Sequence, residues 1–343
     1  MKNTGNETIE SVRKLLGGKP GRLVVVPHEN PDGDAIGSAI GLGEVLRNFG
    51  HKVKIISPNE YPAFLKWFSA SVEVLIYEKQ KKEAKKEMED AAGLICLDFN
   101  EPKRAGWLEK KLLKFAGPKI LIDHHPNPSS FADHLISETH YSSTAELIFD
   151  VIKKTGLTPY LNQAAAEALY TGIMTDTGSF SHNISNPYTF RVIAELMEYG
   201  IDVEKIQSNV YHNFSAERMK LLGHALSKKM KVFTEYRTAI ISLSQKELQD
   251  HGFQPGDTEG FVNYPLSVNN IIFSALFIEK KDMIKASFRS KGTFPANDFA
   301  REHFEGGGHR NAAGGESQIS MEDTIEKFTQ LLGTYRRLLL ETI

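Results

Sequence analysis

The chain is poor in cysteine and has no long apolar run. Cys96 is the single cysteine among 343 residues, so no disulfide can form within the chain. It lies in the apolar segment GLICLDF, where a buried strand thiol is expected rather than a reactive one. No segment approaches the about 20 apolar residues that a membrane-spanning helix needs. The N-terminal stretch MKNTGNETIESVRKLL lacks the apolar core of a signal peptide. These features predict a cytoplasmic protein with no membrane partner.

The chain also lacks an excess of charge of either sign. It has 41 Lys and Arg residues against 43 Asp and Glu residues, a net charge of -2. A protein that binds long nucleic acid through its phosphates usually carries a basic excess. We therefore expect no long duplex nucleic acid as a partner, and any nucleic-acid substrate should be short and held in a local site.

The first half of the chain alternates short apolar runs with amphipathic segments. The runs at 22–28, 52–58, 93–99 and 119–125 predict strands, and the segments at 33–49, 79–91 and 105–115 predict helices. This alternation is typical of an α/β fold, a doubly wound and mostly parallel sheet with helices on both faces. Ligands of such sheets bind beyond the carboxyl ends of the strands.

The pattern changes beyond about residue 229. Segments 231–244, 269–280 and 282–290 predict antiparallel strands, followed by the glycine-rich loop EGGGHRNAAGGE (305–316) and a closing helix. We therefore predict a catalytic domain over 1–199, a helical linker over 200–228 and a smaller α+β domain over 229–343. The active-site cleft is expected between the two domains.

Acidic residues and histidines gather at the carboxyl ends of the predicted strands and at the end of one helical run. They are His28, Asp32, Asp34, Asp98, Asp123, His124, His125 and Asp176. Brought into one crevice, these groups would repel and desolvate one another unless cations lay among them. Donors of this kind without thiolates suit Mn²⁺, with Mg²⁺, Co²⁺ or Zn²⁺ as alternatives. Because the donors exceed the needs of one ion, two ions bridged by a shared carboxylate are expected.

Three local patterns have structural interpretations. Asp32 lies in NPDGD, which is also good turn and helix N-cap chemistry. Ser143 precedes Glu146 by three residues, which predicts a capping box at the start of a helix. Gly33, Gly37 and Gly41 recur every four residues and predict very close packing of their helix on the sheet.

The segments HENPDGDAIGS, LDFN, DHH and TDTGSF resemble the four motifs of the DHH phosphoesterase superfamily. The segments FRS and GGGHRNAAGG resemble its DHHA1 domain. Within the superfamily, the length and the absence of additional domains are most similar to the NrnA-type bifunctional oligoribonucleases (nano-RNases) and pAp phosphatases. The resemblance implies an exonuclease-like hydrolase of phosphoric ester bonds that acts on short RNA and on pAp, and it implies a homodimer.

The resemblance also implies roles for individual residues. His28, Asp32 and Asp98 would bind one metal ion. Asp34, Asp98, His124 and Asp176 would bind the second, with Asp98 bridging the two. Asp123 would orient a histidine, and His125 would contact the phosphate or transfer a proton. Substrate would be held by the second domain through Arg289, Gly306, Gly307, Gly308 and His309. Arg289 and His309 would also face the charge that develops during catalysis.

Two other functions are compatible with these motifs. A stand-alone phosphodiesterase of cyclic-di-AMP or linear pApA would share all of them. A nucleotide-binding regulator without catalytic activity belongs to a different class, and the complete set of acidic and histidine motif residues argues against it. A pyrophosphatase is disfavoured by the glycine-rich C-terminal loop.

Overall fold

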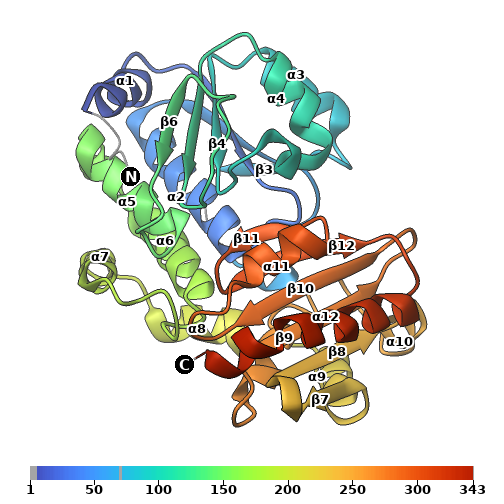
Figure 1. Cartoon of the computed structure of the whole chain (residues 1–343). Coiled ribbons are helices and arrows are strands. Elements are labelled where there is room, and N and C mark those ends of the chain that lie inside the picture. Colours follow the sequence, from blue (N-terminus) through green and yellow to red (C-terminus); the bar gives the residue numbers. More distant parts are fainter. Residues whose placement is uncertain (1–5, 69–71, 343) are drawn as a thin grey trace. The chain divides into compact units, whose positions relative to one another are not determined.

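The computed structural model describes residues 6–68 and 72–342 and divides the chain into two compact units, Met1–Asn213 and Phe214–Ile343 (Figure 1). The division falls within the stretch 200–228. Among the described residues, no helix is both long enough and apolar enough to cross a membrane.

The first unit is built on a six-stranded sheet in the order β3-β2-β1-β4-β5-β6, and all its strands run parallel. Its strands are β1 (Arg22–Pro27), β2 (Lys52–Ser57), β3 (Glu73–Ile76), β4 (Gly93–Leu97), β5 (Lys119–Asp123) and β6 (His134–Ser137). The predicted parallel α/β fold is therefore confirmed. The order reverses between β1 and β4, which is where ligands bind in open sheets of this kind.

Helices cover both faces of this sheet (Figure 1). They are α1 (Asn6–Leu16), α2 (Gly33–Phe49), α3 (Lys81–Glu89), α4 (Glu109–Lys114), α5 (Thr144–Thr155), α6 (Gln163–Asp176), α7 (Pro187–Met197) and α8 (Val203–Tyr211). Along β1, Leu23 and Val25 pack with α2, α5 and α6, whereas Val24 and Val26 pack with α3. Because both faces are buried, the strands are continuous apolar runs rather than alternating ones. Cys96 is buried in β4, and this burial raises the pKa of its thiol to about 12, as expected for an unreactive thiol.

The glycine stripe of α2 packs against α6 rather than on the sheet, so the predicted partner was wrong. A Cβ atom at Gly37 would lie 2.5 Å from the Ala168 carbonyl oxygen and 2.9 Å from the Gly172 amide nitrogen. At Gly33 it would lie 2.2 Å from the Thr175 hydroxyl oxygen. The two helices thus meet backbone to backbone, and this brings the start of α2 close to the end of α6.

We expect Gly37→Ala to destabilise the protein, because the added methyl group has no space between α2 and α6. Overpacking of this kind costs about 1–3 kcal/mol, measured as the free energy of unfolding in urea. Gly333→Ala in α12 (Met321–Glu341) is the matched control, since a Cβ there has no atom within 4 Å. A glycine-to-alanine change in an open helix position adds up to about 1 kcal/mol of stability. Equal stability of both variants would contradict this packing.

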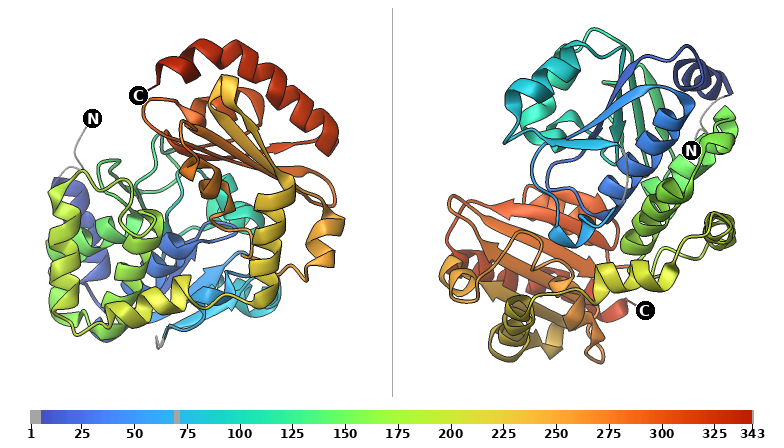
Figure 2. Two further views of the ribbon diagram at one scale, coloured as in Figure 1. Left: turned by 90° about the horizontal axis from the view of Figure 1, so that it is seen from below. Right: turned by 180° about the vertical axis from the view of Figure 1, so that it is seen from behind.

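The second unit contains a six-stranded sheet in the order β11-β12-β10-β9-β8-β7. Its strands are β7 (Met230–Phe233), β8 (Thr238–Leu243), β9 (Phe273–Glu279), β10 (Ile284–Ser290), β11 (Gly307–His309) and β12 (Ala312–Ser317). Its remaining helices are α9 (Ala216–His224), α10 (Gln245–Asp250) and α11 (Ala296–His303). Figure 2 shows α12 lying across one face of this sheet, where its Phe328 and Leu332 pack on Phe273 and Phe277. The predicted smaller α+β domain is confirmed.

Two details of the second sheet differ from the prediction. The segment 231–244 forms two strands rather than one, because the chain turns at Thr234–Tyr236 and Arg237 adopts a left-handed conformation. The prediction that all strands are antiparallel was also wrong, since β8 and β9 are parallel. The chain between these two strands includes α10 and is long enough for the crossover that a parallel pair needs.

Candidate metal centre

The predicted acidic and histidine residues of the first unit lie at the carboxyl edge of its sheet. His28 directly follows β1, Asp98 directly follows β4, and Asp123 is the last residue of β5. Asp98 adopts a left-handed backbone conformation with φ of +65°. Such conformations are uncommon for residues other than glycine and concentrate at functional sites. The turn after β4 thus sets the Asp98 carboxylate between the ends of β1 and β5.

The N-terminus of α2 supplies two further carboxylates. Asp32 is the N-cap, and its Oδ1 accepts hydrogen bonds from the backbone amides of Asp34 and Ala35 at 3.1 and 3.0 Å. The capping interpretation of Asp32 is therefore confirmed, and the capping carboxylate still lies near His28. Asp34, in the first turn, is only 1% exposed. Its two oxygens accept hydrogen bonds from the amides of Thr144 and Ala145 at 2.7 and 2.8 Å.

One group of donors surrounds the His28 ring. Nε2 of His28 lies 3.8 Å from Oδ1 of Asp32 and 3.6 Å from Oδ2 of Asp98. Nδ1 of His28 is 2.8 Å from the Glu29 carbonyl oxygen, which fixes the ring orientation and leaves Nε2 for the carboxylates. The side-chain donor atoms of His28, Asp32 and Asp98 are close enough together to hold a metal ion.

A second group surrounds the His124 ring. Nε2 of His124 lies 3.8 Å from Oδ2 of Asp34, 3.8 Å from Oδ1 of Asp98 and 3.6 Å from Oδ2 of Asp176. These separations exceed hydrogen-bond length. Oδ2 of Asp176, at the end of α6, is buried and has no hydrogen-bond partner. A buried carboxylate oxygen of this kind has the chemistry of a cation ligand. Asp34, His124 and Asp176 are again close enough together to hold a metal ion.

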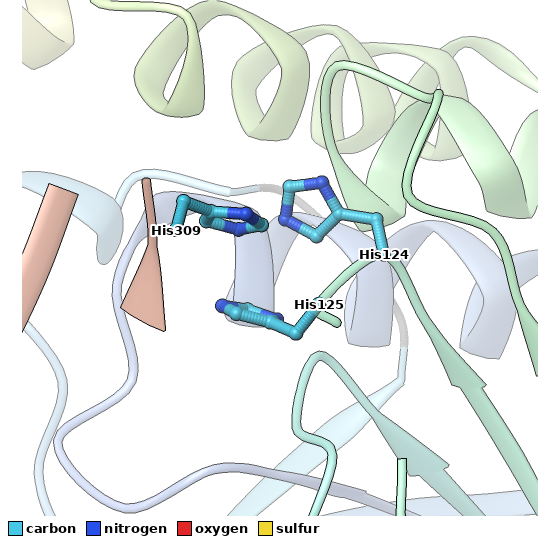
Figure 3. Close-up of side chains that lie close together, drawn as sticks. All are labelled: His124, His125 and His309. Atoms are coloured by element: carbon cyan, nitrogen blue, oxygen red, sulfur yellow. The ribbon is translucent and has the colours of Figure 1, made fainter. Parts of the chain in front are cut away.

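The third group is a carboxylate–histidine contact beside the first two. Nδ1 of His125 lies 2.7 Å from Oδ1 of Asp123, while Oδ2 of Asp123 is buried without a hydrogen-bond partner. Nδ1 of His125 is also 3.6 Å from Oδ1 of Asp98. Figure 3 shows the neighbouring rings of His124 and His125, which have centroids 4.9 Å apart. The Asp123–His125 pair is a carboxylate–imidazole dyad adjoining the donors of the other two groups.

The pKa values of the groups at this edge are shifted because several carboxylates lie close together. Burial disfavours the charged form of His28, but Asp32 and Asp98 raise its pKa to about 9. Burial acts to raise the pKa of these two carboxylates, yet the neighbouring His28 ring leaves both values lowered. Burial, with the charges of Asp98 and Asp176, raises the pKa of Asp34 well above its usual range. Burial also raises the pKa of Asp176 to about 6. Cations among these groups would offset the repulsion.

The second unit places Arg289 and His309 in one row of its sheet. Arg289 of β10 and His309 of β11 both pair with Ala312 of β12, which lies between them. Residues paired in this way point to the same face. Alternate residues of β10, such as Phe288, point into the core, so Arg289 and His309 lie on the other face.

The glycine triplet has a structural reason at two of its positions. A Cβ at Gly306 would lie 2.0 Å from the Gly314 carbonyl oxygen. At Gly308, whose φ is +138°, it would lie 2.5 Å from the Ala312 carbonyl oxygen. Gly307 has open space around it. The close approach of β11 to β12 therefore requires glycine at 306 and 308, and the role of the triplet in substrate binding stays a prediction.

Thr144, which the sequence patterns do not single out, touches two of these carboxylates. The segment SSTAE predicts a capping box, and the structure confirms half of that. Oγ of Ser143 accepts from the Glu146 amide, but Glu146 accepts from the amide of Ser142 rather than of Ser143. The hydroxyl of Thr144 donates to Oδ1 of Asp98 at 2.8 Å. No periodic or compositional signal marks this residue.

Comparison with known proteins assigns both units. The DHH family, N-terminal domain, matches residues 22–173, and the DHHA1 domain matches residues 235–335. The chain is similar to the bifunctional oligoribonuclease and PAP phosphatase NrnA of Thermus thermophilus, with 28% identity over 90% of this chain and 88% of that one. It is also similar to the cyclic-di-AMP phosphodiesterase GdpP of Bacillus subtilis, with 28% identity over 91% of this chain and 48% of that one.

A solved structure, that of an exopolyphosphatase-related protein from Bacteroides fragilis, is 41% identical. It covers 99% of this chain and 100% of its own, with a TM-score of 0.92. The two family matches together account for both structural units, and the motifs of the first unit form the cluster at its sheet edge. This chain is thus a member of the DHH family that carries a C-terminal DHHA1 domain.

Proposed function

We propose that this DHH-family hydrolase cleaves short oligoribonucleotides to mononucleotides and removes the 3′-phosphate of pAp to give AMP. The observation that carries the proposal is the convergence of buried carboxylates and imidazoles at the switch point of the first sheet. The similarity to the Thermus thermophilus NrnA over most of both chains supports the two substrates.

The donors of this edge fit two divalent metal ions, with Mn²⁺ favoured over Mg²⁺ or Co²⁺. Carboxylate and imidazole donors without thiolates suit these ions, and the buried Oδ2 of Asp176, which has no hydrogen-bond partner, supports coordination by this carboxylate. His28, Asp32 and Asp98 would hold one ion, and Asp34, Asp98, His124 and Asp176 the other. When bound, such ions supply Lewis acidity, which makes hydroxide available near neutral pH and offsets charge on the phosphoryl group.

The Asp123–His125 pair is suited to proton transfer. Burial alone would lower the pKa of His125, but the Asp123 and Asp98 carboxylates raise it, which favours the protonated ring. Nδ1 of His125 is held by Oδ1 of Asp123, which fixes the orientation of the ring. In the proposed reaction His125 donates a proton from Nε2 to the leaving oxygen, and Asp123 stabilises the charged ring.

The DHHA1 domain is proposed to hold the rest of the substrate. Arg289 and His309 project from one face of its sheet, and a guanidinium there can make paired hydrogen bonds to phosphate. Gly307 and Gly308 would add backbone amides, whereas the Gly306 amide donates to the Ala300 carbonyl. One phosphate of the substrate would then be held at the metals, and a second phosphate or a base would be held by the DHHA1 domain. This arrangement favours pAp and RNA of a few nucleotides.

A second candidate is hydrolysis of cyclic-di-AMP or linear pApA. The similarity to GdpP of Bacillus subtilis favours it, since 91% of this chain is covered. Both candidate reactions would use the same donors of the first unit, so the substrate decides between them.

The two candidates are separated by comparing initial rates on four substrates with saturating Mn²⁺. The substrates are pAp, a 5′-phosphorylated RNA dinucleotide, pApA and cyclic-di-AMP. We expect turnover of pAp and of both linear dinucleotides, with cyclic-di-AMP slower. Preferential cleavage of cyclic-di-AMP, or cleavage of pApA much faster than of both pAp and the other dinucleotide, would favour the second candidate. Binding of all four without turnover would indicate a regulator.

A further inference from the structure

We propose that Thr144 is a positioning residue that fixes the Asp98 carboxylate for the metal ions. The inference rests on the proposed function, because it assumes that metal ions bind at this edge of the sheet. Thr144 is the first residue of α5 and is completely buried. It contacts two of the proposed ligands, one through its side chain and one through its backbone.

The hydroxyl of Thr144 controls the orientation of Asp98. A hydroxyl can donate a hydrogen bond, and a carboxylate oxygen accepts one. Oγ1 of Thr144 therefore donates to Oδ1 of Asp98, at 2.8 Å. The terminal torsion of an aspartate is soft and roughly two-fold. A single well-placed donor on one oxygen is thus enough to select one orientation of the carboxylate plane.

That orientation divides the two oxygens of Asp98 between the donor groups. Oδ2 faces Nε2 of His28 at 3.6 Å, and Oδ1 faces Nε2 of His124 at 3.8 Å. A carboxylate that serves both groups must present one oxygen to each side. Without the hydroxyl, rotation about the Cβ–Cγ bond would remove this arrangement at little cost.

The backbone of Thr144 holds the neighbouring carboxylate in place. Its amide donates to Oδ2 of Asp34 at 2.7 Å, and the Ala145 amide donates to Oδ1 at 2.8 Å. The first amides of a helix have no partner within the helix, so they are available for this purpose. Asp34 and Asp98 therefore both depend on the first turn of α5, and only the bond to Asp98 requires a particular side chain.

The test compares Mn²⁺ affinity, measured by calorimetry on metal-free protein, in Thr144→Val and Thr144→Ser. Valine keeps the shape of threonine and lacks the hydroxyl, whereas serine keeps the hydroxyl. Loss of an outer hydrogen bond to a metal ligand typically costs about 10–100-fold in affinity. We expect a loss of this size for Thr144→Val and near wild-type affinity for Thr144→Ser. Excess Mn²⁺ should then restore much of the hydrolytic rate of Thr144→Val.

Thr155→Val is the matched control, because Thr155 is a buried threonine of the same helix whose hydroxyl donates to the Val151 carbonyl. Its Mn²⁺ affinity should equal that of wild type. The unfolding midpoint of each metal-free variant reports on folding. If Thr144→Val is less stable than wild type, Thr144→Ala removes the hydroxyl without placing a methyl group beside the carboxylate.

Two results would overturn the proposal: wild-type Mn²⁺ affinity in Thr144→Val, or a loss of affinity in Thr144→Ser as large as in Thr144→Val. The affinity readout also separates this proposal from the proposed function. A wild-type protein that binds Mn²⁺ but hydrolyses neither RNA nor pAp would reject the function and leave the comparison of affinities valid.

Discussion

Asp98→Asn should lower kcat/KM for both pAp and an RNA dinucleotide by at least about a thousandfold, which corresponds to roughly 4 kcal/mol of transition-state stabilisation. Asp98 is the carboxylate that both donor groups share, since its two oxygens face His28 and His124. An amide has no negative charge and a single acceptor oxygen, so the same side chain can no longer serve both ions. The measurement is the initial rate of phosphate or mononucleotide release with saturating Mn²⁺.

Asparagine is the substitution that isolates this effect. Asp98 has a φ of +65°, a conformation that asparagine tolerates and alanine does not favour. The amide can still accept the hydrogen bond from Thr144. The unfolding midpoint of the metal-free protein shows separately whether the variant still folds. A variant that retains more than about a tenth of the wild-type rate would contradict a shared ligand at this position.

Arg289→Gln should reduce kcat/KM for the same substrates by about a hundredfold without changing Mn²⁺ affinity. Removing one donor that faces developing charge typically costs this much. Arg289 belongs to the DHHA1 domain, and all the proposed metal ligands belong to the DHH domain. The two domains therefore make separable contributions, and the affinity for Mn²⁺ reports on the DHH domain alone.

Lys285→Gln provides the control for net charge. Lys285 lies on the same strand and the same face as Arg289, four residues earlier, and it is exposed. Its loss removes one positive charge outside the proposed phosphate site, so the rate should stay close to wild type. Equal losses in both variants would indicate a general electrostatic effect of the sheet rather than a contact of Arg289 with substrate.

The sequence predicts the central part of the first sheet and misses its edges. The apolar runs of β1, β2, β4 and β5 are buried on both faces, which gives a strong signal. β3 and β6 are four residues long and include exposed positions such as Glu73 and Leu135, so their pattern is weak. Hydrophobic periodicity also does not show whether two paired strands run in the same or in opposite directions. It cannot show that β8 and β9 are parallel, because that depends on the path of the connecting chain.

The sequence also does not show which elements pack against one another. The spacing of Gly33, Gly37 and Gly41 predicts a closely packed helix face, and the structure confirms the close packing. The spacing alone does not distinguish a sheet from a second helix. The contact with α6 matters for the site, because it brings Asp34 near Asp176, which follows it by more than a hundred residues.

The proposed metal ligands were identifiable because each follows a strand or begins or ends a helix. Because the strands of a parallel sheet run in one direction, the residues that follow them lie together at the carboxyl edge of the sheet. Thr144 was not identifiable in this way, because its contact with Asp98 joins positions 46 residues apart. The segment SSTAE around it is explained by Ser143 as the N-cap of the helix. Residues that act through another side chain are recognised only when the three-dimensional contacts are known.

Titration of Mn²⁺ into chelator-treated wild-type protein, with bound manganese and phosphate release from pAp followed together, tests the central claim most directly. We expect no hydrolysis in the metal-free protein and a rate that rises to a plateau as two ions bind per chain. A full rate in the metal-free protein, or a rate that stays at the metal-free level while manganese binds, would contradict a metal-dependent phosphoesterase at this sheet edge.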